Sequence, residues 1–384
     1  MSAASGATPF AWSRRQLERI ASSAATTAPA VRPWRLPRVL EREDIWDLWP
    51  VQEEDGMPVV VGAGELWMTL SAPAVGHPEA RHDVARLRLI ARRGDRWEDL
   101  GPAFADGGSP GSREWSGSAV RHADGTLSIY YTAAGRRGEE RLSFGQRVIE
   151  ARTRLVVGDD GRARFDRDVE HRELLRPDGR VYLGAETTEG GPGRIKAFRD
   201  PAWFRDPADG SRHLLVAASV PWRERFMGAV ALATEGDGGW SLRPPLLVAD
   251  GVNHELERPH VVTHGGRYHL FLCTHRSSFH PCDSAPTGLY GFVAPALTGP
   301  YEPLNGTGLV IANPAEQPDQ AYAWWVLPDL RVVSFQDYRG SGERSMLELG
   351  AEEARARFGG TIAPVLRIEL DGARSRIVPT AEAR

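Results

Sequence analysis

The sequence predicts an all-β protein, built as a single five-bladed β-propeller with a central funnel that holds the active site. Short segments rich in β-branched and aromatic residues, bounded by Gly, Asp or Pro, recur along most of the 384 residues. Five polar motifs recur as well, each just before such a segment. Helical periodicity is convincing only near the N-terminus and in Ala351–Phe358. The motif recurrence favours a propeller over a sandwich or another barrel, which similar turns and hairpins also build.

The chain is predicted to divide into an N-terminal arm with a short helix, residues 1–40, and a propeller catalytic domain, residues 41–384. In the arm, Ser13–Ile20 has the pattern of a short helix, and Ser13 is a suitable N-cap. The Ala, Ser, Thr and Pro residues of Ala21–Pro33 predict an extended segment. One domain suits this length, because propellers and barrels routinely exceed the usual domain size.

Strand signals dominate the rest of the chain. The expected strands are Met57–Val61, Leu66–Leu70, Ala85–Ala91, Leu127–Tyr131, Gly145–Ala151, His213–Ala218, Gly228–Ala233, Tyr268–Cys273, Gly288–Val293, Arg331–Phe335 and Val365–Leu370. Turns are expected at Asp124-Gly125, Asp209-Gly210, Gly265-Gly266 and Asp329-Leu330.

The five motifs open the repeating units. They are Ile45-Trp46-Asp47, Arg113-Glu114-Trp115-Ser116, Phe198-Arg199-Asp200-Pro201, Glu255-Leu256-Glu257-Arg258-Pro259 and Gln320-Ala321-Tyr322. Their markers Asp47, Glu114, Asp200, Glu257 and Tyr322 lie 67, 86, 57 and 65 residues apart, which suits four-stranded blades with variable loops. Because the first strand of every blade lines the channel, all five motifs should meet in one funnel.

Composition excludes several classes of partner. The chain is 41% hydrophobic and 26% charged, as in a soluble globular protein. A net charge of −4 predicts no nucleic-acid partner. No stretch is long and apolar enough to span a membrane, and the N-terminus lacks the apolar region of a secretory signal. Cys273 and Cys282 form no disulfide framework or zinc spacing and are expected to be free thiols.

Three of the motifs contain an acid: Asp47, Asp200 and Glu257. Cleavage of a glycoside with retention needs one carboxylate as nucleophile and another as general acid. A third acid can bind ring hydroxyls and stabilise positive charge at the anomeric carbon. Tryptophans beside such acids give the apolar face of a sugar a surface to pack on. Spacing alone does not assign the individual roles.

The ordered set of motifs resembles glycoside hydrolase family 68, which contains levansucrases, inulosucrases and related β-fructofuranosidases. The similar motifs are Trp46-Asp47 with Trp49-Pro50, Arg113 to Gly117, Phe198 to Pro201 and Asn253 to His260. The resemblance extends in order over about residues 10 to 370 and implies a levansucrase-like fructosyltransferase that cleaves sucrose with retention. It implies sucrose and fructan or fructo-oligosaccharide acceptors as partners. Location is expected to be extracellular by a non-classical route, as the family suggests, or cytoplasmic.

The resemblance also implies residue roles. Asp47 would be the nucleophile, Glu257 the acid and base, and Asp200 the stabiliser of the transition state. The substrate-binding residues would be Trp46, Trp115, Ser116, Arg199, Glu255, Arg258, His275 and Tyr322. No acidic calcium site of the kind found in some members is recognisable, so no metal and no cofactor is expected. Trp324 and Trp325, where many members have small and His residues, could reshape acceptor binding.

Structural alternatives exist for these residues. Asp47 could cap a turn, Trp46 and Trp115 could be core residues, and Glu255 could be a solvated acid at a strand end. His275 could be an ordinary polar residue, with Arg276 partly taking its role. Trp49 is expected in the core.

Other functions compete with the fructosyltransferase interpretation. A β-fructofuranosidase would mainly hydrolyse sucrose or make short oligosaccharides. An arabinofuranosidase-type propeller or a non-catalytic sugar-binding propeller would use the same architecture, but the latter should lack one of the three acids, and all are present.

Overall fold

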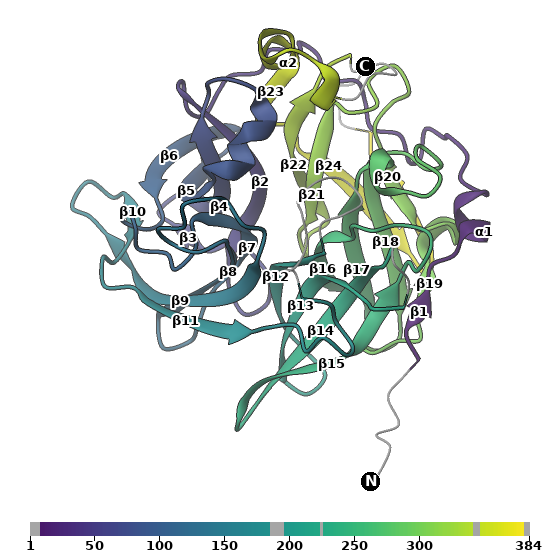
Figure 1. Ribbon diagram of the computed structural model, residues 1–384, viewed down its shortest axis with the longest axis horizontal. Helices are drawn as coiled ribbons and strands as arrows, with labels where there is room; N and C mark the ends of the chain where they lie inside the picture. Colours follow the sequence, from purple (N-terminus) through teal and green to yellow (C-terminus); the bar gives the residue numbers. More distant parts are fainter. Residues whose placement is uncertain (1–7, 185–195, 223–225, 341–345, 380–384) are drawn as a thin grey trace.

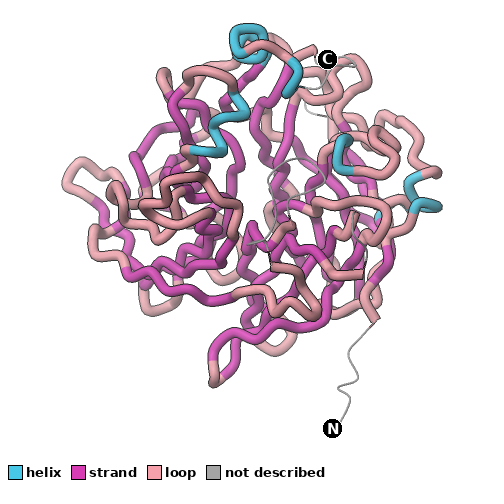
Figure 2. Tube along the Cα trace, in the orientation of Figure 1, coloured by secondary structure: helices cyan, strands magenta, loops and turns pink. Residues whose placement is uncertain are grey.

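The computed structural model describes residues 8–184, 196–222, 226–340 and 346–379. The described chain is mainly β, as the sequence predicts, and Figure 2 shows how little of it is helical. Residues 1–7 of the predicted arm and 380–384 at the C-terminus lie outside the described residues. The division of the chain at residue 40 stays a prediction. No helix in the described ranges is both long and apolar enough to cross a bilayer.

The strands form five antiparallel units, which follow one another along the chain. Unit 1 contains β2 (Glu43–Gln52), β3 (Val60–Val61), β4 (Gly64–Pro73), β5 (Arg86–Arg93) and β6 (Arg96–Pro102). Unit 2 contains β7 (Arg113–Arg121), β8 (Thr126–Ala134), β9 (Gln146–Val157), β10 (Ala163–Phe165) and β11 (Glu170–Leu175). Unit 3 contains β12 (Phe198–Arg205), β13 (Arg212–Ser219), β14 (Gly228–Gly236) and β15 (Gly239–Val248).

The last two units have the same plan. Unit 4 contains β16 (Glu257–His264), β17 (Arg267–Thr274), β18 (Gly288–Ala294), β19 (Glu302–Pro303) and β20 (Leu309–Ala312). Unit 5 contains β21 (Ala321–Val326), β22 (Arg331–Tyr338), β23 (Phe358–Ile362), β24 (Leu366–Asp371) and β25 (Arg374–Ile377). Every predicted strand overlaps one of these elements, although three begin one residue too early and Met57–Val61 contributes only the two residues of β3.

The first strands of the five units contact one another in a closed cycle, β2 to β7, β12, β16, β21 and back to β2. We call them the inner strands. Figure 1 shows the units around this centre, from blue for unit 1 through teal and green to yellow for unit 5. Between units 1 and 2 the contact is a parallel pairing, Val51 with Ala119, so these two units form one ten-stranded sheet. Residues far apart in the sequence therefore meet at the centre.

All four predicted turns join an inner strand to the second strand of its unit. Gly125, Gly210, Gly265 and Gly266 take positive φ there, a conformation that costs glycine little. At the fourth turn Leu330 has φ of 66°, although it has a Cβ.

Each inner strand has a register shift at its motif. The shifts fall between Trp46 and Leu48, Trp115 and Gly117, Arg199 and Ala202, Glu257 and His260, and Tyr322 and Trp325. In four units a residue at the shift has positive φ: Asp47 (51°), Asp200 (57°), Arg258 (50°) and Ala323 (55°). An extra residue in one strand bends it and redirects its side chains. The irregularity therefore lies where the predicted site residues lie.

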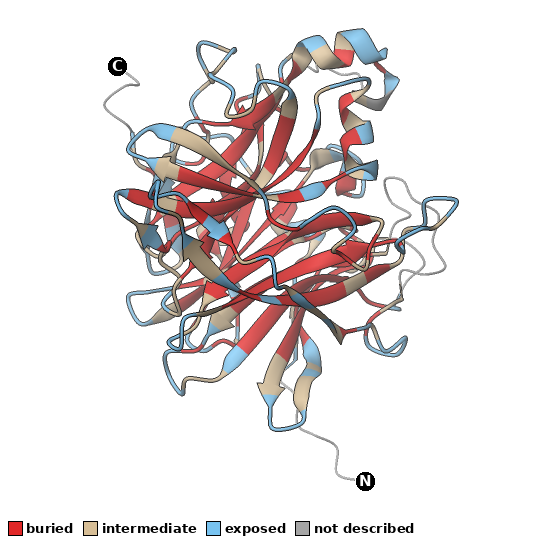
Figure 3. Ribbon diagram, turned by 90° about the vertical axis from the view of Figure 1, so that its left-hand side faces the viewer, coloured by how far each residue is buried: buried red, intermediate tan, exposed pale blue. Residues whose placement is uncertain are grey.

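The core lies between the units. Figure 3 shows buried residues along most of the strands and exposed residues mainly in the loops. The described arm packs on this core: β1 (Phe10–Ala11) pairs in parallel with β15 of unit 3. The side chain of Trp12 contacts Phe279, Tyr290 and Phe292 around unit 4.

Helices are short. The predicted N-terminal helix covers only α1 (Arg14–Leu17), where the Ser13 backbone N–H and hydroxyl donate to the Gln16 side chain. The second prediction matches α2 (Ala351–Arg357). The 3₁₀ helices are η1 (Pro78–Asp83), η3 (Arg276–Ser278), η4 (Leu304–Gly306) and η5 (Met346–Glu348).

Candidate active site

The three predicted acids lie on three inner strands: Asp47 on β2, Asp200 on β12, and Glu257 at the start of β16. Arg258 joins the first two, because its Nη1 lies 3.6 Å from Asp47 Oδ1 and its backbone N–H donates to Asp200 Oδ2 at 3.2 Å. Arg199 donates to Glu257 Oε1 at 2.8 Å, and its Nε lies 3.8 Å from Asp200 Oδ2. The structure therefore gathers all three acids around two arginines.

The acids keep contact with solvent despite their central position. The side chains of Asp47 and Glu257 are 18% and 22% exposed, and that of Asp200 is 8% exposed. This partial exposure leaves the carboxyl groups in reach of a ligand. Because the protein replaces most of the water around them, the local dielectric constant is lower than in solution, and charge interactions at the site are stronger.

Asp47 accepts a hydrogen bond from the Ser116 hydroxyl on β7. Burial raises the pKa of Asp47 above its ordinary value, although the charge of Arg258 and the Ser116 hydrogen bond act in the opposite direction. The two residues come from neighbouring units, so the packing of β2 beside β7 fixes the orientation of this carboxylate.

Glu257 is surrounded by donors. Tyr322 on β21 donates its hydroxyl to Glu257 Oε2, and Arg199 holds the other oxygen. Burial alone would raise the pKa of Glu257, but the charge of Arg199 and the hydrogen bonds from Tyr322 and Arg199 outweigh it and lower the pKa. These donors therefore favour the ionised form of Glu257.

Asp200 has the opposite tendency. Burial raises its pKa, and the negative charges of Glu257 and Asp47 add to that effect against the charge of Arg199. Its backbone N–H donates to Thr132 Oγ1 at 2.9 Å, and Thr132 donates to the Ser116 carbonyl at 3.1 Å. Because like charges this close oppose one another, the cluster retains a proton more readily than three separate carboxyls would.

The remaining predicted residues surround these acids. Glu255 accepts hydrogen bonds from Arg199 at 3.2 Å and from the Ser278 hydroxyl at 3.2 Å. These two bonds fix the orientation of its carboxylate. The Arg258 guanidinium lies over the rings of Trp49 and Trp325, at 5.4 and 5.5 Å from their centroids. Trp49 is fully buried, as expected.

His275 lies beside the cluster. Its ring centroid is 5.8 Å from that of Tyr322, and its Nε2 lies 3.3 Å from Asp319 Oδ1. Burial would lower its pKa, but the hydrogen bond and charge of Asp319 raise it. Arg276 also pairs with Asp319, at 3.2 Å. Both basic residues named in the sequence analysis therefore share one acid.

Trp46 and Trp115 are buried, and both contact η1. The Trp115 indole N–H donates to the His82 carbonyl at 3.0 Å. The Trp46 ring lies 5.6 Å from the His82 ring and 5.3 Å from the Arg81 guanidinium carbon. Sequence reasoning missed η1, because it opens no repeat. Thr132 and Asp319 were missed for the same reason.

Trp324 and Trp325 lie in β21, directly after the motif that contains Tyr322. Both are buried, and Trp325 stacks on His260 at 4.3 Å with an interplanar angle of 7°. His260 Nδ1 hydrogen-bonds the Arg258 carbonyl at 3.0 Å, and its Nε2 accepts from the Val326 N–H at 3.0 Å. Trp325 lines a cavity at the opposite ends of the inner strands and also packs against Arg258, so an effect of the two tryptophans on acceptor binding stays a prediction.

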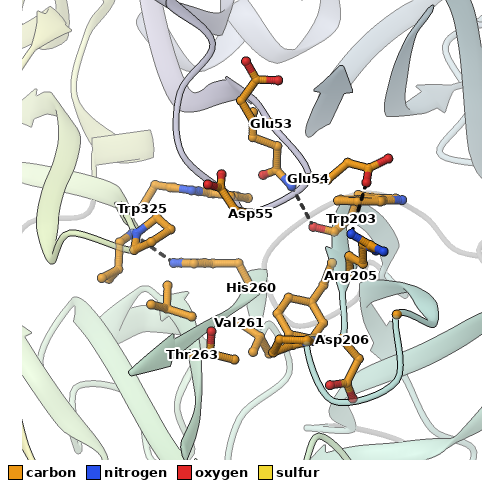
Figure 4. A pocket seen from close by; sticks show the side chains of 18 of the residues that line it. Glu53, Glu54, Asp55, Trp203, Arg205, Asp206, His260, Val261, Thr263 and Trp325 are labelled. Carbon is orange, nitrogen blue, oxygen red and sulfur yellow. Dashed lines mark hydrogen bonds and ion pairs between the residues drawn. The ribbon is translucent and has the colours of Figure 1, made fainter. Parts of the chain in front are cut away.

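That cavity, of about 730 Å³, lies at the other ends of the inner strands. Figure 4 shows Trp203, His260 and Trp325 on its wall, with the acidic turn of Glu53, Glu54 and Asp55 above them. None of the predicted substrate-binding residues lines it. Among the described residues no group of three or more His, Cys, Asp or Glu side chains has the arrangement of a metal site, and Cys273 and Cys282 are free.

Cleavage of a glycosidic bond requires a pair of carboxyls at one site. Here three carboxyls from separate strands gather around two arginines, with tryptophans beside them. The comparisons agree. The sequence matches the family described as levansucrase/invertase, glycoside hydrolase family 68, over residues 1–229 and 220–382. The levansucrase LscA of Pseudomonas savastanoi pv. glycinea is 33% identical over 415 residues, covering 96% of this chain and 94% of that protein.

Solved structures give the same result. The inulosucrase from Halalkalicoccus jeotgali bound to kestose has a TM-score of 0.89 and 39% identity, covering 96% of this chain and 95% of that one. The levansucrase from Gluconacetobacter diazotrophicus has a TM-score of 0.79 at 23% identity, covering 98% and 91%, which supports the fold alone. The chain belongs to glycoside hydrolase family 68.

Proposed function

We propose that this protein is a levansucrase-like fructosyltransferase, which cleaves sucrose with retention and transfers the fructosyl unit to fructan, to another sugar or to water. The observation that carries the proposal is the set of hydrogen bonds and ion pairs that joins Asp47, Asp200 and Glu257 through Arg199 and Arg258. Membership of family 68 supports it. So does the 39% identity to an inulosucrase bound to kestose.

In the first step, a carboxylate oxygen of Asp47 forms a bond to the fructosyl anomeric carbon while the bond from that carbon to the glucosyl oxygen breaks. Glu257 gives its proton to the departing oxygen, and glucose leaves. In the second step, Glu257 takes a proton from water or an acceptor hydroxyl, whose oxygen displaces Asp47. Two inversions at one carbon give net retention.

The electrostatics of the cluster support this division of labour. Ser116 and Arg258 favour the ionised form of Asp47, which the nucleophile needs. Asp200, next to Arg199, would bind fructosyl hydroxyls and stabilise the positive charge of the transition state. Burial and the mutual repulsion of the acids raise the pKa of Asp200 and favour retention of a proton in the cluster, and the productive form would have that proton on Glu257.

The other proposed binding residues complete the substrate pocket. Trp46 and Trp115 would wall the fructosyl unit, and Ser116 would orient the nucleophile. Further polar contacts to sucrose would come from Arg199, Glu255, Arg258, His275 and Tyr322. No step requires a metal ion or a cofactor.

We also propose that the five units are the blades of a five-bladed β-propeller. The closed cycle of inner strands and the antiparallel pairing inside each unit support this description. A crystal structure with the inner strands around a single axis would agree with it. Two sheets packed face to face would contradict it.

The direct test is glucose release from sucrose by the wild type and by Asp47→Ala. The variant should lose this activity while keeping its thermal unfolding transition, because Asp47 supplies the bond-forming oxygen. Asp95→Ala is the control, since the Asp95 side chain is fully exposed on unit 1. Unchanged turnover in Asp47→Ala would refute the assignment.

The family includes invertases, so a mainly hydrolytic β-fructofuranosidase is the second candidate. Water and sugar compete for the same fructosyl enzyme, and the ratio of free fructose to glucose on concentrated sucrose measures the outcome. A ratio near one indicates hydrolysis, and a clear excess of glucose indicates transfer.

A further inference from the structure

The 3₁₀ helix η1, between β4 and β5, brings a histidine to the site that belongs to none of the recurring motifs. The His82 ring packs edge-on against Trp46, with 5.6 Å between centroids and an interplanar angle of 79°. Its carbonyl accepts the indole N–H of Trp115 at 3.0 Å. His82 therefore contacts both tryptophans that are proposed to wall the fructosyl unit.

The polar atoms of this ring are available to a ligand. The His82 side chain is 42% exposed, although the tryptophans beside it are buried. Its Nε2 lies 3.8 Å from Glu79 Oε2, beyond hydrogen-bond distance. Within the described part of the chain, no hydrogen bond uses either ring nitrogen of His82. An exposed, unbonded imidazole between two aromatic walls is suited to a sugar hydroxyl.

The charges of the catalytic cluster act on this ring. Partial desolvation within the site and the charge of the adjacent Arg81 lower the pKa of His82 below its ordinary value, while Glu79 and Glu257 act in the opposite direction; because 42% of the side chain is exposed, the effect of desolvation is moderate. In return, His82 contributes to the lowered pKa of Glu257. At neutral pH the imidazole is therefore uncharged, with one nitrogen that donates and one that accepts.

The segment that holds His82 is rigid. Arg81 Nη1 donates to the Pro78 carbonyl at 3.0 Å and to Glu79 Oε1 at 2.7 Å. Its guanidinium lies between Trp46 and Phe358, 5.3 and 4.7 Å from their ring centroids. His77 caps the start of the helix, because its Nδ1 accepts the Glu79 N–H at 3.2 Å. These contacts hold the backbone that carries His82, so η1 need not become ordered when substrate binds.

We propose that His82 is a substrate-binding residue, whose imidazole hydrogen-bonds a hydroxyl of the fructosyl unit seated against Trp46 and Trp115. This inference rests on the proposed function. It adds a contact from η1 to a site whose other proposed binding residues belong to the inner strands, to the segment that precedes β16 or to the segment that follows β17. Because the contact is to the fructosyl unit, it acts before the intermediate partitions between water and sugar.

The test compares the wild type with His82→Ala, His82→Gln and His77→Ala. Initial rates of glucose release over a range of sucrose concentrations give kcat/KM. The ratio of free fructose to glucose gives the partition of the fructosyl enzyme between water and sugar acceptors. His82→Ala should lower kcat/KM by about three- to tenfold, the usual worth of one hydrogen bond. His82→Gln should recover part of the loss, because the amide both donates and accepts. The partition should stay at the wild-type value.

His77→Ala is the matched control. It removes the N-cap hydrogen bond of η1 but leaves the Arg81 contacts that hold the helix next to His82, so its kcat/KM should stay close to the wild-type value. If it loses as much as His82→Ala, the effect belongs to the fold of η1 and the proposal fails.

The remaining outcomes are distinct. If the wild type is active and His82→Ala has the same kcat/KM, the proposed role of His82 is wrong, while the proposed function is unaffected. A changed partition with unchanged glucose release also overturns it, because it places the contact on the acceptor. A wild type that releases no glucose from sucrose overturns the proposed function and this inference together.

Discussion

At the scale of single residues, two hydroxyls adjust the acids of the site. Ser116 donates to Asp47, and Tyr322 donates to Glu257. Each hydrogen bond favours the ionised carboxylate and so lowers its pKa, whereas burial raises the pKa of the same group. Their removal should therefore move opposite limbs of the pH profile, because the nucleophile must be ionised and the general acid must be protonated.

Ser116→Ala should shift the acid limb of kcat/KM for glucose release to higher pH. Without the hydroxyl the pKa of Asp47 rises, so less of it is ionised at a given acid pH. A hydrogen bond to a charged group is worth enough for a loss of about 10- to 100-fold in kcat/KM near neutral pH. An acid limb that stays in place would show that Asp47 does not govern it.

Tyr322→Phe should shift the alkaline limb of kcat to higher pH. The phenol helps to lower the pKa of Glu257, so its loss lets the acid keep its proton further into the alkaline range. The measurement is kcat for glucose release as a function of pH under saturating sucrose. An alkaline limb that moves to lower pH would contradict the assignment of Glu257 as the acid.

Sequence reasoning found these residues because each lies in a motif that opens a repeat. It could not find His82, Thr132 or Asp319. His82 comes from a short helix without periodicity, and the other two lie in ordinary strand and loop sequence. Their place in the site depends on how the units pack, which no local pattern encodes. Trp325 shows that the reverse also happens. It is close to a motif in the sequence, but it lines the cavity at the opposite end of its strand.

At the scale of elements, the register shifts of the inner strands decide where the site residues point. Strand existence was predictable from apolar runs and Gly or Asp turns. The register shifts could not be predicted, because a bulge depends on how two strands pair. On β7 the shift follows Trp115, and Gly117 is its tightest point, since a Cβ there would lie 1.8 Å from the Tyr130 carbonyl oxygen.

Gly117→Ala should therefore destabilise the protein by about 3 kcal/mol or more, the upper range for overpacking a core. The obstacle is backbone of β8, which cannot move aside as a flexible side chain would. Thermal unfolding measures the loss, and glucose release should also fall because Ser116 is displaced. Gly238→Ala is the control, because nothing lies within 4 Å of a Cβ there. Equal melting temperatures for the two variants would contradict this account.

At the scale of the whole molecule, five units close into a cycle through their inner strands, and the described arm crosses one of the joints. β1 extends unit 3, while Trp12, 1% exposed, packs among aromatic rings around unit 4 and donates to the Thr307 carbonyl at 3.1 Å. The sequence indicated an extended arm but not this contact, because nothing local marks Trp12 as an anchor.

Trp12→Ala should cost about 3–5 kcal/mol, as for other large buried aromatic side chains. The melting temperature should fall by several degrees or more, whereas Trp222→Ala should leave it close to the wild type, since Trp222 is 50% exposed. If the two variants have the same melting temperature, the arm does not stabilise the joint between units 3 and 4.

The cycle also means that the site belongs to no contiguous piece of the chain. A cut in the loop between β6 and β7 would leave Asp47 on one fragment and Asp200 and Glu257 on the other. Neither fragment alone would hold the proposed nucleophile together with the proposed proton donor. Mixed in equal amounts, the two halves could regain turnover only by rebuilding the circle, so split-protein complementation would report directly on its assembly.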